Sequence, residues 1–254
     1  MSYFVFDNKH IYYEEWGEGT PLLFLHGNTA SSNMYFQFAQ NYKQNFRVIL
    51  MDFLGHGKSD RLKDFPVDLW FFEAQQVISF LKEKHYENVN IVGSSGGAMV
   101  AINVALEEPK LINKVIADSF VGEKAHELFT KNLLMDRKQT KEDNNARMFY
   151  AYMHGDDWEQ IVDNDTEAVM RHEKEIGQYF HKSLCSLKAD ILLTGSRKDE
   201  FMVAISDNYL EDSYRDMINQ IGHGNIHMFN MGGHPAMITN QEEFYEMSLE
   251  FLLK

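Results

Sequence analysis

The sequence has little cysteine, since Cys185 is the single one among 254 residues. An internal disulfide is therefore excluded, and so is a small fold that disulfides hold together. Long apolar runs are also missing, because no stretch reaches the roughly 18 apolar residues that a membrane-spanning helix needs. The N-terminal residues, MSYFVFDNKHIYYEE, lack the basic region and apolar segment of a secretory signal. We therefore expect no membrane contact, and a reducing cytoplasm is the simplest location.

Positive charge is scarce as well, with 24 lysines and arginines against 38 aspartates and glutamates. The formal net charge of −14 would repel a phosphate backbone on average, so no nucleic-acid partner is expected. The chain has a large share of apolar residues: 44% of its residues are hydrophobic and 13% are aromatic. This composition predicts a folded core. Its length suits one α/β domain or two small ones.

Short apolar runs that end in polar or glycine residues recur along the chain, as is typical of strands buried on both faces of a sheet. Strands are predicted at Tyr3–Phe6, Ile11–Trp16, Pro21–Leu25, Arg47–Met51, Val89–Val92, Asn113–Ala117, Ile191–Thr194 and Ile226–Met231. Helical patterns between them are predicted at Asp68–Lys84, Ala98–Leu106 and Gln241–Leu253. This alternation predicts an α/β fold, namely a mostly parallel, doubly wound sheet of about eight strands with an antiparallel N-terminal hairpin.

One segment breaks the alternation of strands and helices. Between Phe120 and about Ser183 the patterns are helical, and no run is typical of a strand. One helical face in this segment carries Trp158, Ile161, Val162, Asp165 and Val169. We therefore predict a helical cap, residues 120–183, inserted into an α/β core formed by residues 1–119 and 184–254.

The stretch NIVGSSGGAMV places two serines side by side between glycines. Ser95 lies between Gly93 and Gly97 in the pattern G-x-S-x-G, whereas Ser94 has Val92 two positions before it. Glycines at these positions allow a sharp strand-to-helix turn that lifts the central hydroxyl clear of the sheet. A phosphate-binding loop is less well supported, because neither G-x-G-x-x-G nor Gly-Lys-Ser/Thr is present. The pattern predicts that Ser95 is a nucleophile.

A serine hydroxyl needs a general base, and the base needs an orienting acid. His234, in GGHPAM, follows the last predicted strand, and Asp199, in LLTGSRKDEF, follows the strand before it. Asp118 also follows a predicted strand and competes with Asp199 for the role of the acid. We favour Asp199, because Asp118 has a simpler role in capping the start of the helical segment.

A metal site is not expected from the histidines. His223 and His227 are four residues apart, but Gly222, Gly224 and Asn225 make that stretch a turn rather than a helix face. No third ligand is evident. We therefore predict neither a metal nor a cofactor.

Four segments, LFLHGNTAS, MDFLGHGKSD, IVGSSGGA and GGHPAM, resemble the α/β-hydrolase fold family in its small form with a helical cap. The resemblance extends from Tyr3 to Leu253 and implies a catalytic triad of Ser95, His234 and Asp199, in the family's chain order. In most of the family the acid follows the strand after the cap, which again favours Asp199 over the earlier aspartate.

The resemblance implies further roles for residues near the serine. Backbone N–H groups of Asn28 and Gly96 are expected to form the oxyanion hole, which binds the negatively charged oxygen of the reaction intermediate. His26 and His56 occupy positions that shape loops in the family, and they are not expected to act as the base.

Serine at the nucleophile position argues against haloalkane dehalogenases and epoxide hydrolases, which carry aspartate there. We expect carboxylic ester hydrolysis of a small molecule through an acyl-enzyme. Carbon–carbon bond hydrolysis of a diketone, lactone hydrolysis and cofactor-free perhydrolysis remain alternatives, as does a hydrolase-like small-molecule receptor. The oligomeric state is open, with a homodimer among the alternatives. Aromatic and methionine residues of the cap either line the pocket or form the cap's own core: Phe129, Met135, Met148, Phe149, Tyr152, Met153 and Trp158.

Overall fold

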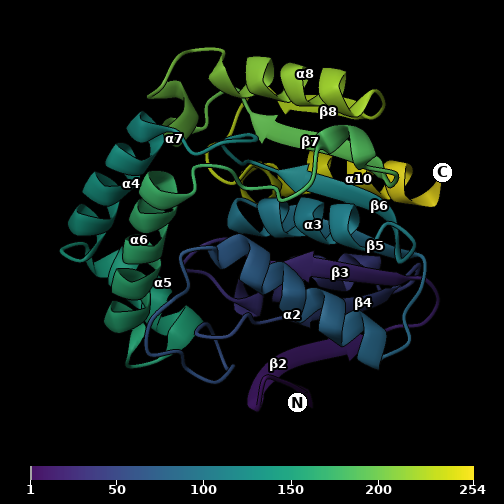
Figure 1. Ribbon diagram of the computed structural model, residues 1–254, viewed down its shortest axis with the longest axis horizontal. Coiled ribbons are helices and arrows are strands. Elements are labelled where there is room, and N and C mark those ends of the chain that lie inside the picture. The colour runs from purple at the N-terminus through teal and green to yellow at the C-terminus, as the bar shows by residue number, and fades with distance from the viewer. Residues whose placement is uncertain (1) are drawn as a thin grey trace.

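The computed structural model describes residues 2–254. An eight-stranded sheet forms its centre, with strand order β1-β2-β4-β3-β5-β6-β7-β8 (Figure 1). β1 pairs antiparallel with β2, and β2 with β4, while the other neighbouring strands run parallel. The predicted fold class is confirmed. The strands are β1 (Ser2–Phe6), β2 (Lys9–Trp16), β3 (Pro21–Leu25), β4 (Arg47–Met51), β5 (Val89–Ser94), β6 (Ile112–Asp118), β7 (Asp190–Ser196) and β8 (Asn225–Phe229).

Helices cover both faces of the sheet, and each face has its own apolar cluster. One cluster packs the sheet against α2 (Leu69–Glu83), α3 (Gly96–Glu107) and α8 (Tyr209–Ile221). The other packs it against α10 (Gln241–Leu253) and shorter helical segments. These segments are α1 (Phe36–Ala39), α9 (Ala236–Thr239) and the 3₁₀ turns η1 (Ser32–Met34) and η2 (Gln40–Tyr42). Burial on both faces explains why the central strands are continuous apolar runs.

Three helices lie between β6 and β7 in the chain: α4 (Glu127–Thr140), α5 (Asn144–His154) and α6 (Trp158–Glu175). In Figure 1 they stand together beyond the arrowheads of β3 and β7, so they cover the carboxyl ends of the parallel strands. Among the described residues of this segment, β-pairing is limited to one bridge between Lys124 and Gln178. The predicted apolar face of α6 is buried as expected. We call α4–α6 the cap; its exact boundaries at residues 120 and 183 stay a prediction.

Two parts of the core differ from the sequence prediction. The last strand ends at Phe229 rather than Met231, because Met231 is exposed and belongs to the loop that follows. The prediction also missed α8, although its buried residues, Leu210, Tyr214, Met217 and Ile221, have helical spacing. A short helix, α7 (Glu200–Val203), and a 3₁₀ turn, η3 (Leu184–Ser186), complete the core. None of the described helices has the length and apolar character that crossing a bilayer requires.

Candidate active site

Ser95 occupies the turn between β5 and α3, with φ 54° and ψ −121°. Such a conformation is strained for a residue other than glycine and is typical of a nucleophile on a strand-to-helix turn. The glycines on either side permit it. A Cβ atom on Gly93 would lie 2.1 Å from the Gly97 carbonyl oxygen, and one on Gly97 would lie 2.2 Å from the Leu25 oxygen. The G-x-S-x-G pattern is therefore a steric requirement of this turn.

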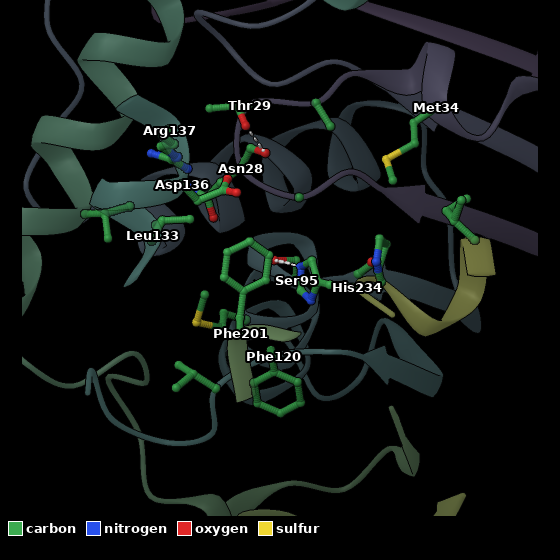
Figure 2. A pocket seen from close by; sticks show the side chains of 18 of the residues that line it. Asn28, Thr29, Met34, Ser95, Phe120, Leu133, Asp136, Arg137, Phe201 and His234 are labelled. Atoms are coloured by element: carbon green, nitrogen blue, oxygen red, sulfur yellow. Dashed lines mark hydrogen bonds between the residues drawn. The ribbon is translucent and has the colours of Figure 1, made fainter. Parts of the chain in front are cut away.

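The two adjacent serines point to different partners. The Ser95 Oγ lies 3.1 Å from Nε2 of His234, and Figure 2 shows the two side chains facing one another at the cavity. The Ser94 hydroxyl is buried and donates a long hydrogen bond of 3.5 Å to Oδ2 of Asp118. The structure thus brings Ser95, and not Ser94, to the imidazole.

Asp199 completes the hydrogen-bonded chain from the other side of the imidazole. Its Oδ2 lies 2.8 Å from Nδ1 of His234, and its Oδ1 accepts a hydrogen bond from the Phe201 N–H at the start of α7. The side chain is fully buried, so both oxygens are held in place. Glu200, which the sequence analysis did not single out, accepts a hydrogen bond of 3.1 Å from the His234 backbone N–H. These two hydrogen bonds hold the segment after β7, which contains Asp199 and Glu200, against the loop after β8, which contains His234.

Asp118, the competing aspartate, is directed elsewhere. Its Oδ1 accepts from the Thr194 hydroxyl at 2.8 Å, and its Oδ2 accepts from the Met237 N–H at 3.0 Å. Burial raises the pKa of this carboxyl to about 6. The predicted capping role is wrong, because Asp118 connects β6 to β7 and to α9 instead of capping the segment that follows it. Within residues 2–254, no hydrogen bond joins Asp118 to His234.

The loop after β3 lies against the serine turn. A Cβ atom on Gly27 would be 2.9 Å from the Ser95 Cβ, and one on Gly96 would be 2.2 Å from Oδ1 of Asn28. In the described part of the chain, the backbone N–H groups of Asn28 and Gly96 donate no hydrogen bond. Both donors are therefore available beside Ser95, as an oxyanion hole requires, and their role stays a prediction.

The other two histidines of the signature segments are buried beneath the site. His26 accepts a hydrogen bond from the Phe53 N–H at Nε2 and donates one from Nδ1 to the Gly27 carbonyl. Burial holds its pKa well below the usual value, so it stays neutral. His56 lies 4.0 Å from Glu73 and 3.8 Å from Asp165. Neither His26 nor His56 reaches Ser95. Nowhere in residues 2–254 do three or more histidine, cysteine or acidic side chains group as metal ligands would.

A cavity of about 350 Å³ opens above Ser95 between the cap and the core (Figure 2). Its wall is mostly apolar and includes two charged residues of α4. The core contributes Met34, Tyr35, Trp70, Met99, Phe120, Val121, Phe201 and Ile238, among others. The cap contributes Phe129, Leu133, Asp136, Arg137, Phe149, Tyr150 and Val169.

The seven cap residues considered from the sequence divide into three groups. Phe129 and Phe149 line the cavity. Met153 and Trp158 are buried in the cap, while the remaining three, Met135, Met148 and Tyr152, are exposed. Sequence reasoning missed Asp136 and Arg137, because adjacent charged residues on a polar helix usually face solvent.

Comparison with known proteins agrees with this architecture. Residues 20–137 match the model of the alpha/beta hydrolase fold family. The structure superimposes on the meta-cleavage product hydrolase of Pseudomonas fluorescens with a TM-score of 0.78, at 18% identity over 99% of this chain and 97% of that one. The chain therefore has the α/β-hydrolase fold.

Other similar proteins are named as hydrolases of more than one kind. The 2-hydroxy-6-oxo-6-phenylhexa-2,4-dienoate hydrolase of Comamonas testosteroni is 24% identical, over 95% of this chain and 91% of that one. An esterase from Exiguobacterium antarcticum has a TM-score of 0.71, at 19% identity over 98% of this chain and 97% of that one. The comparisons support a hydrolase, and the similar proteins include both a dienoate hydrolase and an esterase.

The pH dependence of the hydrolase should follow His234. Burial alone would lower the pKa of this imidazole, but the Asp199 carboxylate and nearby acidic side chains raise it above its usual value. Only neutral imidazole accepts the serine proton, so kcat/KM should fall as pH decreases through a pKa above about 6.5. Initial rates on an ester from about pH 5 to pH 9 measure this acid limb. A limb centred well below pH 6.5 would contradict an ionised Asp199 beside the ring.

Proposed function

We propose that this α/β-hydrolase cleaves carboxylic esters of small, uncharged and mostly apolar substrates through an acyl-enzyme. The observation that carries the proposal is the hydrogen-bonded chain from Asp199 through His234 to Ser95, which ends at the cavity. The same groups in this relation activate a serine for acyl transfer.

The geometry accounts for each step of ester cleavage. The Ser95 Oγ attacks the carbonyl carbon while Nε2 of His234 accepts its proton. The resulting oxyanion accepts hydrogen bonds from the N–H groups of Asn28 and Gly96, each worth about 3–4 kcal/mol in the transition state. His234 then returns the proton to the alkoxide leaving group. Water, activated by the same imidazole, releases the acyl group from Ser95.

The charges in the cavity wall favour an uncharged substrate. Arg137 is buried, and its Nη1 lies 2.6 Å from Oδ1 of Asp165, so its charge is already compensated. Asp136 is half-buried in the same wall, and burial raises the pKa of its carboxyl against the opposing influence of Arg137. A substrate carboxylate would meet one paired cation and one acid here, which gives little net attraction.

Carbon–carbon bond hydrolysis is the second candidate. The similarity to the dienoate hydrolase of Comamonas testosteroni, which extends over 95% of this chain, favours it. The name of that relative describes a dienoate substrate, which carries a carboxylate. The same serine and histidine would serve this reaction. The paired Arg137 and the neighbouring Asp136 argue against it, because an anionic substrate would have to compete with Asp165 for the guanidinium.

A substrate panel separates these functions. We expect p-nitrophenyl esters of short to medium acyl chains to be hydrolysed with a kcat/KM at least about 10²-fold above that for 2-hydroxy-6-oxo-6-phenylhexa-2,4-dienoate. Ser95→Ala serves as the background control for every compound. Preference for the dienoate would establish the carbon–carbon hydrolase instead. Turnover at background on every compound, with tight binding of one of them, would indicate a receptor.

A further inference from the structure

Asp165 is an acidic residue buried where the cap meets the core. It lies on α6, with no exposed side-chain surface. Its Oδ1 pairs with Arg137 of α4, and its Oδ2 accepts a hydrogen bond of 2.7 Å from Nδ2 of Asn28. Burial alone would raise its pKa, but Arg137, His56 and Asn28 lower the pKa to about 2. The side chain is therefore a carboxylate at neutral pH, and such a buried charge persists because it is paired.

The side chain of Asn28 is held at both ends. Its Nδ2 donates to Asp165, and its Oδ1 accepts a hydrogen bond of 3.2 Å from the indole N–H of Trp70. If the amide were flipped, its oxygen would face the Asp165 carboxylate and its NH₂ group would face the Trp70 N–H, and neither pair could form a hydrogen bond. These two partners therefore select one orientation of the amide. The same side chain lies on the first turn of α3, where a Cβ atom on Gly96 would clash with it. Asn28 thus bridges the cap and the serine turn.

The loop that contains Asn28 is also held by the cap at other points. Thr29 has φ 56°, which is costly for a residue with a β-carbon and needs support from its surroundings. His154 of α5 donates a hydrogen bond of 2.9 Å from Nε2 to the Thr29 carbonyl oxygen. The Asn33 side chain donates to the Tyr152 carbonyl of the same helix at 3.0 Å. The conformation of this loop therefore depends on contacts with α5 and α6.

We propose that Asp165 is a positioning residue, which orients the Asn28 backbone N–H toward the oxyanion by holding the Asn28 side chain from the cap. The inference rests on the proposed function, in which this N–H stabilises the oxyanion. The oxyanion hole is then complete only when α6 is packed on the loop after β3. The cap accordingly takes part in organising the catalytic groups, in addition to forming the wall of the cavity.

Loss of this support should affect the chemical step more than substrate binding. Removal of one oxyanion donor lowers kcat by about 10²–10³-fold. A donor that is present but poorly oriented should lower kcat by a smaller factor. We expect Asp165→Asn to lower kcat by about 10- to 100-fold with KM changed less than about threefold, because the charge on oxygen develops only in the transition state.

The experiment compares Asp165→Asn with Asp163→Asn, the same substitution two residues earlier on α6, where the side chain is exposed and pairs with Lys141. Two quantities are measured: kcat and KM on p-nitrophenyl butyrate, and the second-order rate constant for labelling of Ser95 by a fluorophosphonate. Asp165→Asn should be slower in both kcat and labelling, while Asp163→Asn should match the wild type. Circular dichroism and melting show whether each variant is folded.

A second variant keeps the buried ion pair intact. Asn28→Ala removes the bridging amide but leaves Asp165 and Arg137 paired, so it provides the test even if Asp165→Asn fails to fold. If Asp165 acts through Asn28, the double variant should be no slower than the slower single variant. Effects that multiply instead would show two independent roles and overturn the inference.

The outcomes separate this inference from the ester proposal. Wild-type protein that is labelled at Ser95 but hydrolyses no ester contradicts the ester proposal, while the labelling rates of the variants still test Asp165. Folded Asp165→Asn or Asn28→Ala protein that is labelled at the wild-type rate overturns the positioning role. Wild-type protein that is not labelled at all contradicts both.

Discussion

Replacement of Ser95 by alanine should lower kcat by at least about 10³-fold and leave the fold intact. The Oγ of Ser95 lies within hydrogen-bond distance of Nε2 of His234, and the turn that presents it is shaped by glycines on both sides. Alanine tolerates the same backbone conformation no worse than serine, so the loss should be chemical. Steady-state kinetics on an ester, with circular dichroism of the variant, measure both parts of the expectation.

The neighbouring serine provides the matched control. The hydroxyl of Ser94 is buried toward Asp118, so Ser94→Ala should keep kcat within about tenfold of wild type. Fluorophosphonate should label Ser95, which fragment ions distinguish from Ser94 within one peptide. Label on Ser94, or an active Ser95→Ala protein, would remove Ser95 from its role as nucleophile.

Features governed by local rules could be predicted from the sequence. The strand Arg47–Met51 and the helix Gln241–Leu253 have the bounds that their patterns predict. A hydrophobic run or a helical periodicity can be recognised from a few consecutive residues of the sequence. The turn at Ser95 could also be predicted, because an apolar strand, a G-x-S-x-G pattern and a helix follow one another directly in the sequence. These parts depend on neighbours in the chain.

The contacts of the cap could not be predicted in the same way. Asp165 appeared on an otherwise apolar helical face, which is the signal of a buried acid, but its partner Asn28 is 137 residues away. Arg137 lies on a helix with mostly polar side chains, and its burial follows from how α4 packs on α6. Such pairs arise from tertiary packing, which overrides the usual preference of charged residues for solvent.

The choice between two aspartates also depended on three-dimensional position. Asp118 is the last residue of β6, so its side chain stays at the sheet and reaches Thr194 on the adjacent strand. Asp199 lies three residues beyond the end of β7, in a loop that approaches the loop of His234. Sequence order allows both, because each precedes the histidine and follows a strand. The family resemblance favoured Asp199, and the hydrogen bond to His234 gives the physical reason.

Asp199→Asn should therefore lower kcat by up to about 10⁴-fold, since the amide can neither hold the productive imidazole tautomer nor stabilise the imidazolium. Without the carboxylate that raises its pKa, His234 should also titrate at lower pH, which moves the acid limb of kcat/KM downward. Asp118→Asn should stay within about tenfold of wild type, because the amide oxygen can still accept from the Met237 N–H while the amide nitrogen donates to the Thr194 hydroxyl. With both variants shown to be folded by melting curves, the reverse ranking would make Asp118 the orienting acid.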